Sequence, residues 1–343
     1  MHDEPGISRE QLQACLQEQY DLIPDTFDFL PLGLDNRAGV YHVVSTQGLH
    51  YLLKVKSGPL YEPAYLVPRY LFDQGIATVV APLLTRSKTL WTRIGDWIVV
   101  VYPFLNGDTN WTGMTEKHWE EVGTTFKRIH QFPLPANGFE SLRKETFDPT
   151  EYVRWVHTFE SQYTHSEDGE SSQRALRAAW LANQPVIHAV VASLEKLADV
   201  LQKYSGPYVI CHADLHPANL LREPTGQVFV IDWDEVMLAP KERDFIFLRE
   251  TPANDQALQD SSSFFQAYGS TEIDWIALAY YRYERVIQDL IACGEEVFLR
   301  DDLGETTKAD AVQLFHDILS ESGEIAAAYA AEAHLSSDQR HKI

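Results

Sequence analysis

The chain has 343 residues, of which 45% are hydrophobic and 23% are charged, and its formal net charge is −22. This length favours two lobes, and this composition is typical of a folded enzyme rather than of a disordered chain. So large a negative charge would repel a phosphate backbone, which argues against nucleic-acid binding, and it would attract a cationic small molecule. The charge can also serve solubility alone, so both interpretations stay open.

The sequence predicts no membrane segment. Its longest apolar run, Trp97 to Leu105, is far shorter than the ~20 residues that span a bilayer. The first residues are acidic and polar, which is unlike a signal peptide. Cys15, Cys211 and Cys293 lie far apart and form no CxxC pair. We therefore expect a reduced, cytoplasmic protein, and nothing in the pattern indicates an obligate protein partner.

The first third of the chain has mainly strand patterns. A capping-box pattern beginning at Ser8 predicts a helix that ends near Tyr20. The strand-like segments are Gly39–Thr46, His50–Lys56, Thr78–Leu84, Thr89–Ile94 and Trp97–Phe104. Residues 61–74 have helical spacing, although two prolines interrupt it. We expect an N-terminal lobe over residues 1–105, built from one antiparallel sheet.

Helical patterns dominate the remainder. Thr115 is the N-cap of a predicted helix that continues to about His130, and Asp148 with Pro149 marks another helix start. Residues 165–172 have the composition of an exposed loop, and helical patterns then continue to about residue 204. The fold class predicted is α+β, with a sheet lobe, a hinge at about residues 102–107, and a mainly α-helical C-terminal lobe over residues 108–343.

One block carries the residues of a chemical site. A buried-strand pattern over Tyr208–Cys211 leads into a loop that contains Asp214 and Asn219. A second strand, Val228–Ile231, ends at Asp232. We expect these three polar side chains to converge. Phosphoryl transfer needs a base beside the attacking hydroxyl and hard oxygen ligands for Mg²⁺, and D-x-x-x-x-N followed by Ile-Asp is the kinase arrangement. Asp214 is then the predicted base, and Asn219 and Asp232 the metal ligands.

Two other interpretations of this block remain open. Asp, Asn and Pro are common turn residues, so the block can be a turn-rich hairpin between buried strands. Alternatively, His212, Asp214 and His216 alternate in a pattern that can supply nitrogen and oxygen ligands to Zn²⁺. For the kinase interpretation, we expect His212 to brace the loop through backbone hydrogen bonds.

A phosphate site is predicted in the first lobe. Lys54 and Lys56 lie on one face of a strand, where a lysine among apolar residues is costly unless it meets an anion. We favour Lys54 as the phosphate ligand and Glu62 as its carboxylate partner; the alternative is an edge strand protected by lysines. The loop of residues 33–39, which contains Asn36, precedes this strand, and its backbone amides can cover phosphates.

These residues resemble the aminoglycoside-phosphotransferase family of the protein-kinase-like fold, most closely the spectinomycin phosphotransferases. The most specific segments are Ile231–Glu235, Met237–Asp244 and the helix pattern Tyr280–Arg285. The short span between Asp232 and Pro240 leaves no room for a protein-kinase activation segment, which argues against protein substrates.

The resemblance implies ATP with its adenine on a hinge that contains Tyr102 and Phe104, and Mg²⁺ on Asn219 and Asp232. It also implies that Asp214 deprotonates a hydroxyl of an aminocyclitol or aminoglycoside antibiotic, which would make the chain a resistance kinase. Asp234 and Glu235 would then face a cationic acceptor. The alternatives are a metabolic small-alcohol kinase of the choline, homoserine or methylthioribose type, and a catalytically inactive nucleotide-binding protein.

Overall fold

A computed structural model of the chain describes residues 4–31, 38–110, 112–135, 137–165, 168–204, 206–248 and 256–336, with the side chains of 256–261 excepted. By its internal contacts the chain divides into two compact units. The first contains residues 1–143, 209–238 and 262–270, and the second contains residues 144–208, 239–261 and 271–343. This division groups the 209–238 block with the sheet, whereas the sequence placed a lobe boundary at residue 105.

An antiparallel sheet with the strand order β1-β2-β3-β5-β4 occupies the first unit. Its strands are β1 (Pro24–Leu30), β2 (Ala38–Ser45), β3 (His50–Ser57), β4 (Thr92–Ile94) and β5 (Trp97–Pro103). In the register of this sheet, Lys54 of β3 lies opposite Val40 and Val100, and Leu52 lies opposite His42 and Tyr102. Directly opposed residues share a face, so these side chains lie on the same side of the sheet.

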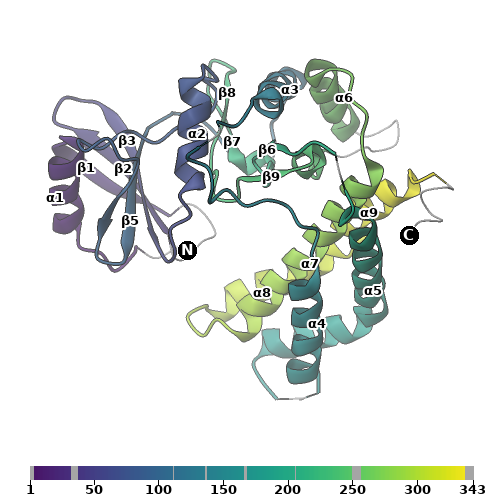
Figure 1. Cartoon of the computed structure of the whole chain (residues 1–343). Helices are drawn as coiled ribbons and strands as arrows, with labels where there is room; N and C mark the ends of the chain where they lie inside the picture. Colours follow the sequence, from purple (N-terminus) through teal and green to yellow (C-terminus); the bar gives the residue numbers. More distant parts are fainter. Residues whose placement is uncertain are drawn as a thin grey trace. The chain divides into compact units, whose positions relative to one another are not determined.

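Two helices cover opposite faces of this sheet (Figure 1). Leu12 and Leu16 of α1 (Arg9–Tyr20) are buried in a cluster with Tyr41, Val43 and other odd-numbered residues of the strands. The other face packs Ile98 and Val100 against α2 (Pro63–Asp73). As the sequence predicted, Ser8 is the N-cap of α1, because its side chain accepts a hydrogen bond from the Gln11 amide.

The five-stranded sheet differs from the prediction in three places. β1 was not predicted, because its Pro-Asp-Thr-Phe-Asp sequence lacks a strand composition; it is an edge strand that pairs only with β2. Residues 78–84 form no strand of the sheet, since they contain Pro82 and bond to β8 through a single bridge at Val79. The segment predicted at 89–94 is reduced to the three residues of β4.

The rest of the first unit holds the predicted chemical block. Helix α3 (Glu116–Gln131) begins after the Thr115 cap. The short elements that follow are β6 (Val209–Cys211), the 3₁₀ helix η1 (Pro217–Asn219), β7 (Leu220–Arg222), β8 (Val228–Val230) and β9 (Met237–Ala239). β7 and β8 form a hairpin, and β6 pairs with β9. The hairpin therefore joins Asn219 at its start to Asp232 just beyond its end.

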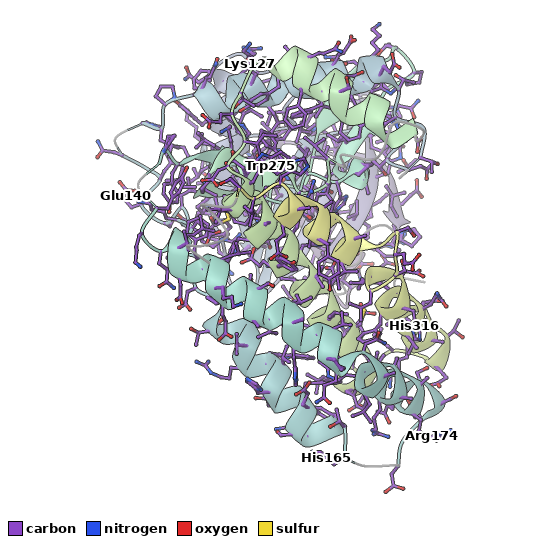
Figure 2. All side chains as sticks on the ribbon, turned by 90° about the vertical axis from the view of Figure 1, so that its right-hand side faces the viewer. Lys127, Glu140, His165, Arg174, Trp275 and His316 are labelled. Atoms are coloured by element: carbon purple, nitrogen blue, oxygen red, sulfur yellow. The ribbon has the colours of Figure 1, made fainter. Side chains whose placement is uncertain are left out.

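Helices form the second unit. They are α4 (Thr150–Tyr163), α5 (Ser171–Leu201), the 3₁₀ helix η2 (Lys241–Phe245), α7 (Trp275–Phe298), α8 (Glu305–Ile318) and α9 (Glu324–Ala333). Helix α6 (Gln256–Tyr268) has residues in both units. Trp275, labelled in Figure 2, begins α7 and stacks on His334 with ring centroids 3.9 Å apart. This contact fixes the end of α9 against the start of α7.

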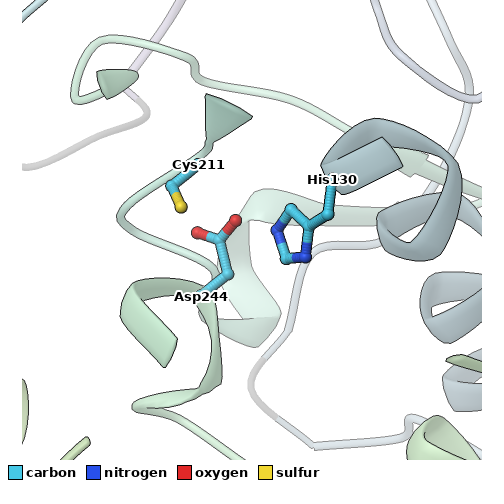
Figure 3. A group of neighbouring side chains, drawn as sticks. All are labelled: His130, Cys211 and Asp244. Carbon is cyan, nitrogen blue, oxygen red and sulfur yellow. The ribbon is translucent and has the colours of Figure 1, made fainter. Parts of the chain in front are cut away.

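The α+β fold class predicted from the sequence is confirmed, with an antiparallel sheet followed by a mainly helical part. Among the helices that the structure describes, none combines the length and the apolar composition needed to cross a bilayer. Cys15, Cys211 and Cys293 are buried, and none of them forms a disulfide within the described part of the chain. Figure 3 shows Cys211 at the end of β6 and His130 near the end of α3, both in the first unit.

Candidate active site

Asp214 lies in the loop between β6 and η1, and Asn219 closes that loop. The Asn219 side-chain nitrogen Nδ2 donates to the backbone oxygen of Asp214 at 2.8 Å and to its carboxylate Oδ2 at 3.2 Å. His216 Nε2 lies 3.3 Å from the same oxygen. The Asp214 side chain nevertheless keeps 26% of its surface exposed. The loop thus holds a carboxylate in a fixed place that a substrate can reach.

His212 ties this loop to the end of β8. It is fully buried; its Nε2 donates to the Ile231 oxygen at 2.8 Å, and its Nδ1 accepts from the Asp214 amide at 3.4 Å. This agrees with the predicted bracing role. Both ring nitrogens are thus engaged by backbone groups, an arrangement that suits the bracing role better than the ligation of zinc. Trp233 is buried and packs edge-on against His212, with ring centroids 4.7 Å apart.

The backbone is strained on both sides of this brace. Ala213 has a φ of 70° and Asp232 a φ of 60°, in the left-handed region that residues other than glycine rarely adopt. Conformations of this kind cost on the order of 1–3 kcal/mol each and persist where the surroundings hold them. Here the His212 hydrogen bonds hold the neighbouring residues, and the Ile231 amide also donates to the Asn219 oxygen at 3.0 Å. These bonds join the loop of Asp214 and Asn219 to Ile231, the residue before Asp232.

Lysines of β3 meet the acidic residues that follow β8. Lys54 Nζ lies 3.0 Å from Asp232 Oδ1 and 3.1 Å from Asp234 Oδ2. Lys56 Nζ lies 2.9 Å from the same Asp234 oxygen. The exposed fraction of the side chain is 17% for Lys54, 26% for Asp234 and 47% for Asp232. Asp232 is thus the most accessible of these groups.

The pKa values follow from this pairing. Burial by itself would lower the pKa of the Lys54 ammonium, but the carboxylates of Asp232 and Asp234 outweigh it and hold that pKa well above its usual value. Burial likewise opposes ionisation of Asp234, yet Lys54 and Lys56 lower the pKa of its carboxyl to about 2. Lys54 and Asp234 are therefore both charged at neutral pH.

The predicted pairing of Lys54 with Glu62 is wrong for this structure. Lys54 bonds to Asp232 and Asp234, whereas Glu62 occupies the N-cap of α2 without a side-chain capping bond. The reason is that the turn after β8 brings two carboxylates to the Lys54 face, while Pro63 starts α2 directly after Glu62. That Glu62 contributes to nucleotide binding stays a prediction.

Glu235, the second acid beyond Asp232, pairs with Arg143. Its Oε2 lies 3.1 Å from Arg143 Nη2, and the two side chains are 56% and 46% exposed. Arg143 also lies over the Tyr61 ring, 4.4 Å from its centroid. In the second unit, Lys241 of η2 bonds to Glu242, and Arg243 bonds to Glu284 of α7.

The predicted hinge residues lie at the end of β5. Tyr102 is on the Lys54 face, and the Phe104 amide donates to the His50 oxygen at 3.3 Å. The Phe104 ring lies 4.1 Å from the ring of His42, whose Nε2 is 2.9 Å from His50 Nδ1. His42, Leu52 and Tyr102 are only half-buried. A partly apolar strip of His42, Leu52 and Tyr102 thus lies on the same face of the sheet as Lys54. Asn36, also predicted to bind the cofactor, lies outside the described residues.

Several contacts were missed by the sequence reasoning. The bond between Lys56 and Asp234 could have been anticipated from the sequence, since Lys56 shares a strand face with Lys54. Nothing in the sequence near Arg143 predicts its bond, because its partner Glu235 is 92 positions away in the chain. Arg222 is buried and pairs with Asp108 at 2.7 Å, joining β7 to the segment after β5. Only the fold brings these residues together.

The chain was compared with families of known proteins and with solved structures. Residues 26–281 match the phosphotransferase enzyme family. The chain is 26% identical over 200 residues to Protein StrN from Streptomyces griseus, a match that spans 54% of this chain and 59% of that protein. The chain thus matches less than two thirds of the length of that relative.

Solved structures extend the likeness over almost the whole chain. The spectinomycin phosphotransferase APH(9)-Ia, in complex with ADP and spectinomycin, has a TM-score of 0.84 and 27% identity, and the match covers 96% of this chain and 99% of that one. Choline kinase LicA from Streptococcus pneumoniae shares the fold at a TM-score of 0.54 and 16% identity, with 94% and 98% covered. The predicted protein-kinase-like fold and the family resemblance are confirmed, and the protein is accordingly a phosphotransferase that belongs to the phosphotransferase enzyme family.

Proposed function

We propose that this protein transfers the γ-phosphoryl group of ATP to a hydroxyl of an aminocyclitol or aminoglycoside, an acceptor similar to spectinomycin. The observation that carries the proposal is the convergence of a base, oxygen ligands and a lysine: Asp214, Asn219, Asp232 and Lys54. Such a set is what phosphoryl transfer requires. The family membership and the 27% identity to a spectinomycin phosphotransferase support it.

Asp214 is the catalytic base in this proposal. Its carboxylate orients the acceptor hydroxyl and takes its proton as the hydroxyl oxygen attacks the γ-phosphorus and ADP leaves. Asn219 and His216 keep the carboxylate in place, and its 26% exposed surface is accessible to the acceptor. Lys54 binds the phosphates, and the adenine lies on the strip of His42, Leu52 and Tyr102 beside Phe104. That strip supports the assignment because it is half-buried, contains aromatic rings and shares the Lys54 face.

The donor atoms suit a magnesium ion. Asn219 uses its Nδ2 for the Asp214 loop, which leaves the oxygen Oδ1 as its ligand atom. The Asp232 carboxylate is 47% exposed, so it is open to a cation. Carboxylate and amide oxygens are the ligands that Mg²⁺ prefers. When bound, the ion would neutralise charge on the transferred phosphoryl group. We assign Asn219 and Asp232 to it.

A cationic acceptor suits the acidic residues near this site. Glu235 has 56% of its side chain exposed, and its ion pair with Arg143 lies at the surface, where such pairs contribute little and exchange readily. Asp234, the other predicted acceptor residue, already has two lysine partners. We therefore assign the ammonium group of the acceptor to Glu235. The net charge of −22 favours the same class of acceptor.

A substrate panel tests the proposal. Purified protein with ATP or GTP is given aminoglycosides, aminocyclitols, choline, homoserine and methylthioribose, and both ADP or GDP release and the phosphorylated product are measured. We expect the highest kcat/KM with ATP and a spectinomycin-like aminocyclitol. Preference for choline or another small alcohol would favour the metabolic alternative, and nucleotide binding without any turnover would favour an inactive nucleotide-binding protein.

A further inference from the structure

One carboxylate oxygen holds both lysines of β3. Asp234 Oδ2 accepts from Lys54 Nζ at 3.1 Å and from Lys56 Nζ at 2.9 Å. The three side chains are largely buried, with 26%, 17% and 29% of their surfaces exposed. Because β3 alternates its faces, the two lysines project to the same side of the sheet. Asp234 therefore fixes the ends of two long side chains at one point.

Asp232 cannot provide this fixed point by itself. It also bonds to Lys54, at 3.0 Å, but it is nearly twice as exposed as Asp234 and is the proposed ligand of the metal. A carboxylate that shares its charge with a divalent cation holds a lysine less strongly. Glu62 bonds to neither lysine among the described residues. Asp234 is thus the carboxylate that can stay on Lys54 when the site is loaded.

We infer that Asp234 is the positioning residue of the phosphate-binding Lys54, with Lys56 as its brace. This inference rests on the proposed function, because it gives Lys54 the nucleotide phosphates. A lysine stem has many rotamers, and holding its ammonium in advance reduces the ordering that nucleotide binding requires. Lys56 supplies the second positive charge, so that Asp234 stays in place when Lys54 turns toward phosphate.

This role differs from a contact with the acceptor. An acceptor residue needs an accessible carboxylate, and Glu235, the next residue, is twice as exposed as Asp234. The two roles also affect different constants. Loss of Asp234 as a positioning residue weakens nucleotide binding in the absence of any acceptor, whereas loss of an acceptor contact raises only the acceptor KM.

The test is nucleotide affinity, measured by calorimetry with Mg·ATP and no acceptor. Asp234→Asn should raise the Kd for Mg·ATP about tenfold, the loss expected for one charge-assisted contact, while the acceptor KM changes less than about twofold. Asp234→Glu, which keeps the charge, should restore part of the affinity, and Lys56→Met should raise the Kd about threefold. Asp96→Asn removes one exposed carboxylate in the β4–β5 turn and is the matched control, with unchanged affinity.

Wild-type nucleotide affinity in Asp234→Asn, with a raised acceptor KM, would overturn the inference and return Asp234 to the acceptor. If Asp234→Asn does not fold, the Lys56→Met variant provides the test. An unchanged Kd for Mg·ATP in that variant would contradict the inference that Lys56 and Asp234 position Lys54. Failure of the proposed function is a separate result: the wild-type protein would bind Mg·ATP yet phosphorylate nothing, and the calorimetric comparison of variants would still stand.

Discussion

At the scale of single residues, Asp214 is the group whose role is most sharply defined by its contacts. Asn219 and His216 both reach its Oδ2, and the side chain remains partly exposed. Asp214→Ala should lower kcat by about 10²–10⁴-fold, the usual contribution of a positioned base, and leave the Kd for ATP nearly unchanged. Steady-state kinetics and calorimetry on the same preparation measure both. Turnover near that of the wild type would remove Asp214 from the mechanism.

Asp232 should behave differently, because it is assigned to the metal. Asp232→Asn replaces a charged ligand with a neutral amide, which is a poorer ligand for a hard dication, so Mg²⁺ and Mg·ATP should both bind more weakly. Titration of Mg²⁺ at fixed ATP checks this, with Asp96→Asn as the control for the loss of one charge. An unchanged Mg²⁺ requirement would place the metal on other residues.

At the scale of elements, α3 packs so closely on α6 that the side chain at position 123 of α3 cannot be larger than that of glycine. A Cβ added at Gly123 would lie 2.3 Å from the backbone oxygen of Phe264 and 3.1 Å from the Tyr268 nitrogen. Replacing a helix glycine with alanine ordinarily stabilises a helix by about 0.5–1 kcal/mol, whereas overpacking costs about 1–3 kcal/mol. Since the backbone atoms of Phe264 and Tyr268 cannot rotate away from the added Cβ, the cost of overpacking should exceed the gain in helix stability. Gly123→Ala should therefore lower the Tm. The exposed neighbour Thr124→Ala is the control. A raised Tm for Gly123→Ala would show that α3 and α6 can separate.

At the scale of the whole molecule, the net charge of −22 should act on the rate at which a cationic acceptor is captured. Raising the salt from about 20 mM to about 300 mM shortens the Debye length well below the dimensions of the protein, so the acceptor KM should rise several-fold. The KM for Mg·ATP, an anion, should stay level or fall. The test is to measure the acceptor KM at several salt concentrations, once for a cationic acceptor and once for a neutral alcohol. Equal salt dependence for cationic and neutral acceptors would mean that the charge serves solubility alone.

The candidate site residues could be predicted from the sequence because they lie close together along the chain. Asp214 and Asn219 sit in one loop, and the β7–β8 hairpin brings Asp232 back to them, so spacing alone defined the set. The bracing role of His212 followed from its place beside Asp214. The caps at Ser8 and Thr115 are equally local, and both are present as predicted.

What the sequence by itself determined is therefore the fold class, and it defined the residues of the candidate site, because each depends on periodicity or on residues a few positions apart. Only the tertiary structure decided which charges meet. Lys54 and Asp232 are 178 positions apart, and a pattern of acids and lysines allowed Glu62 as readily as Asp234. The choice was made by the register of β3 in the sheet and by the turn after β8, which place Asp234 between two lysines. Contacts over such separations follow from packing, and no local propensity encodes them.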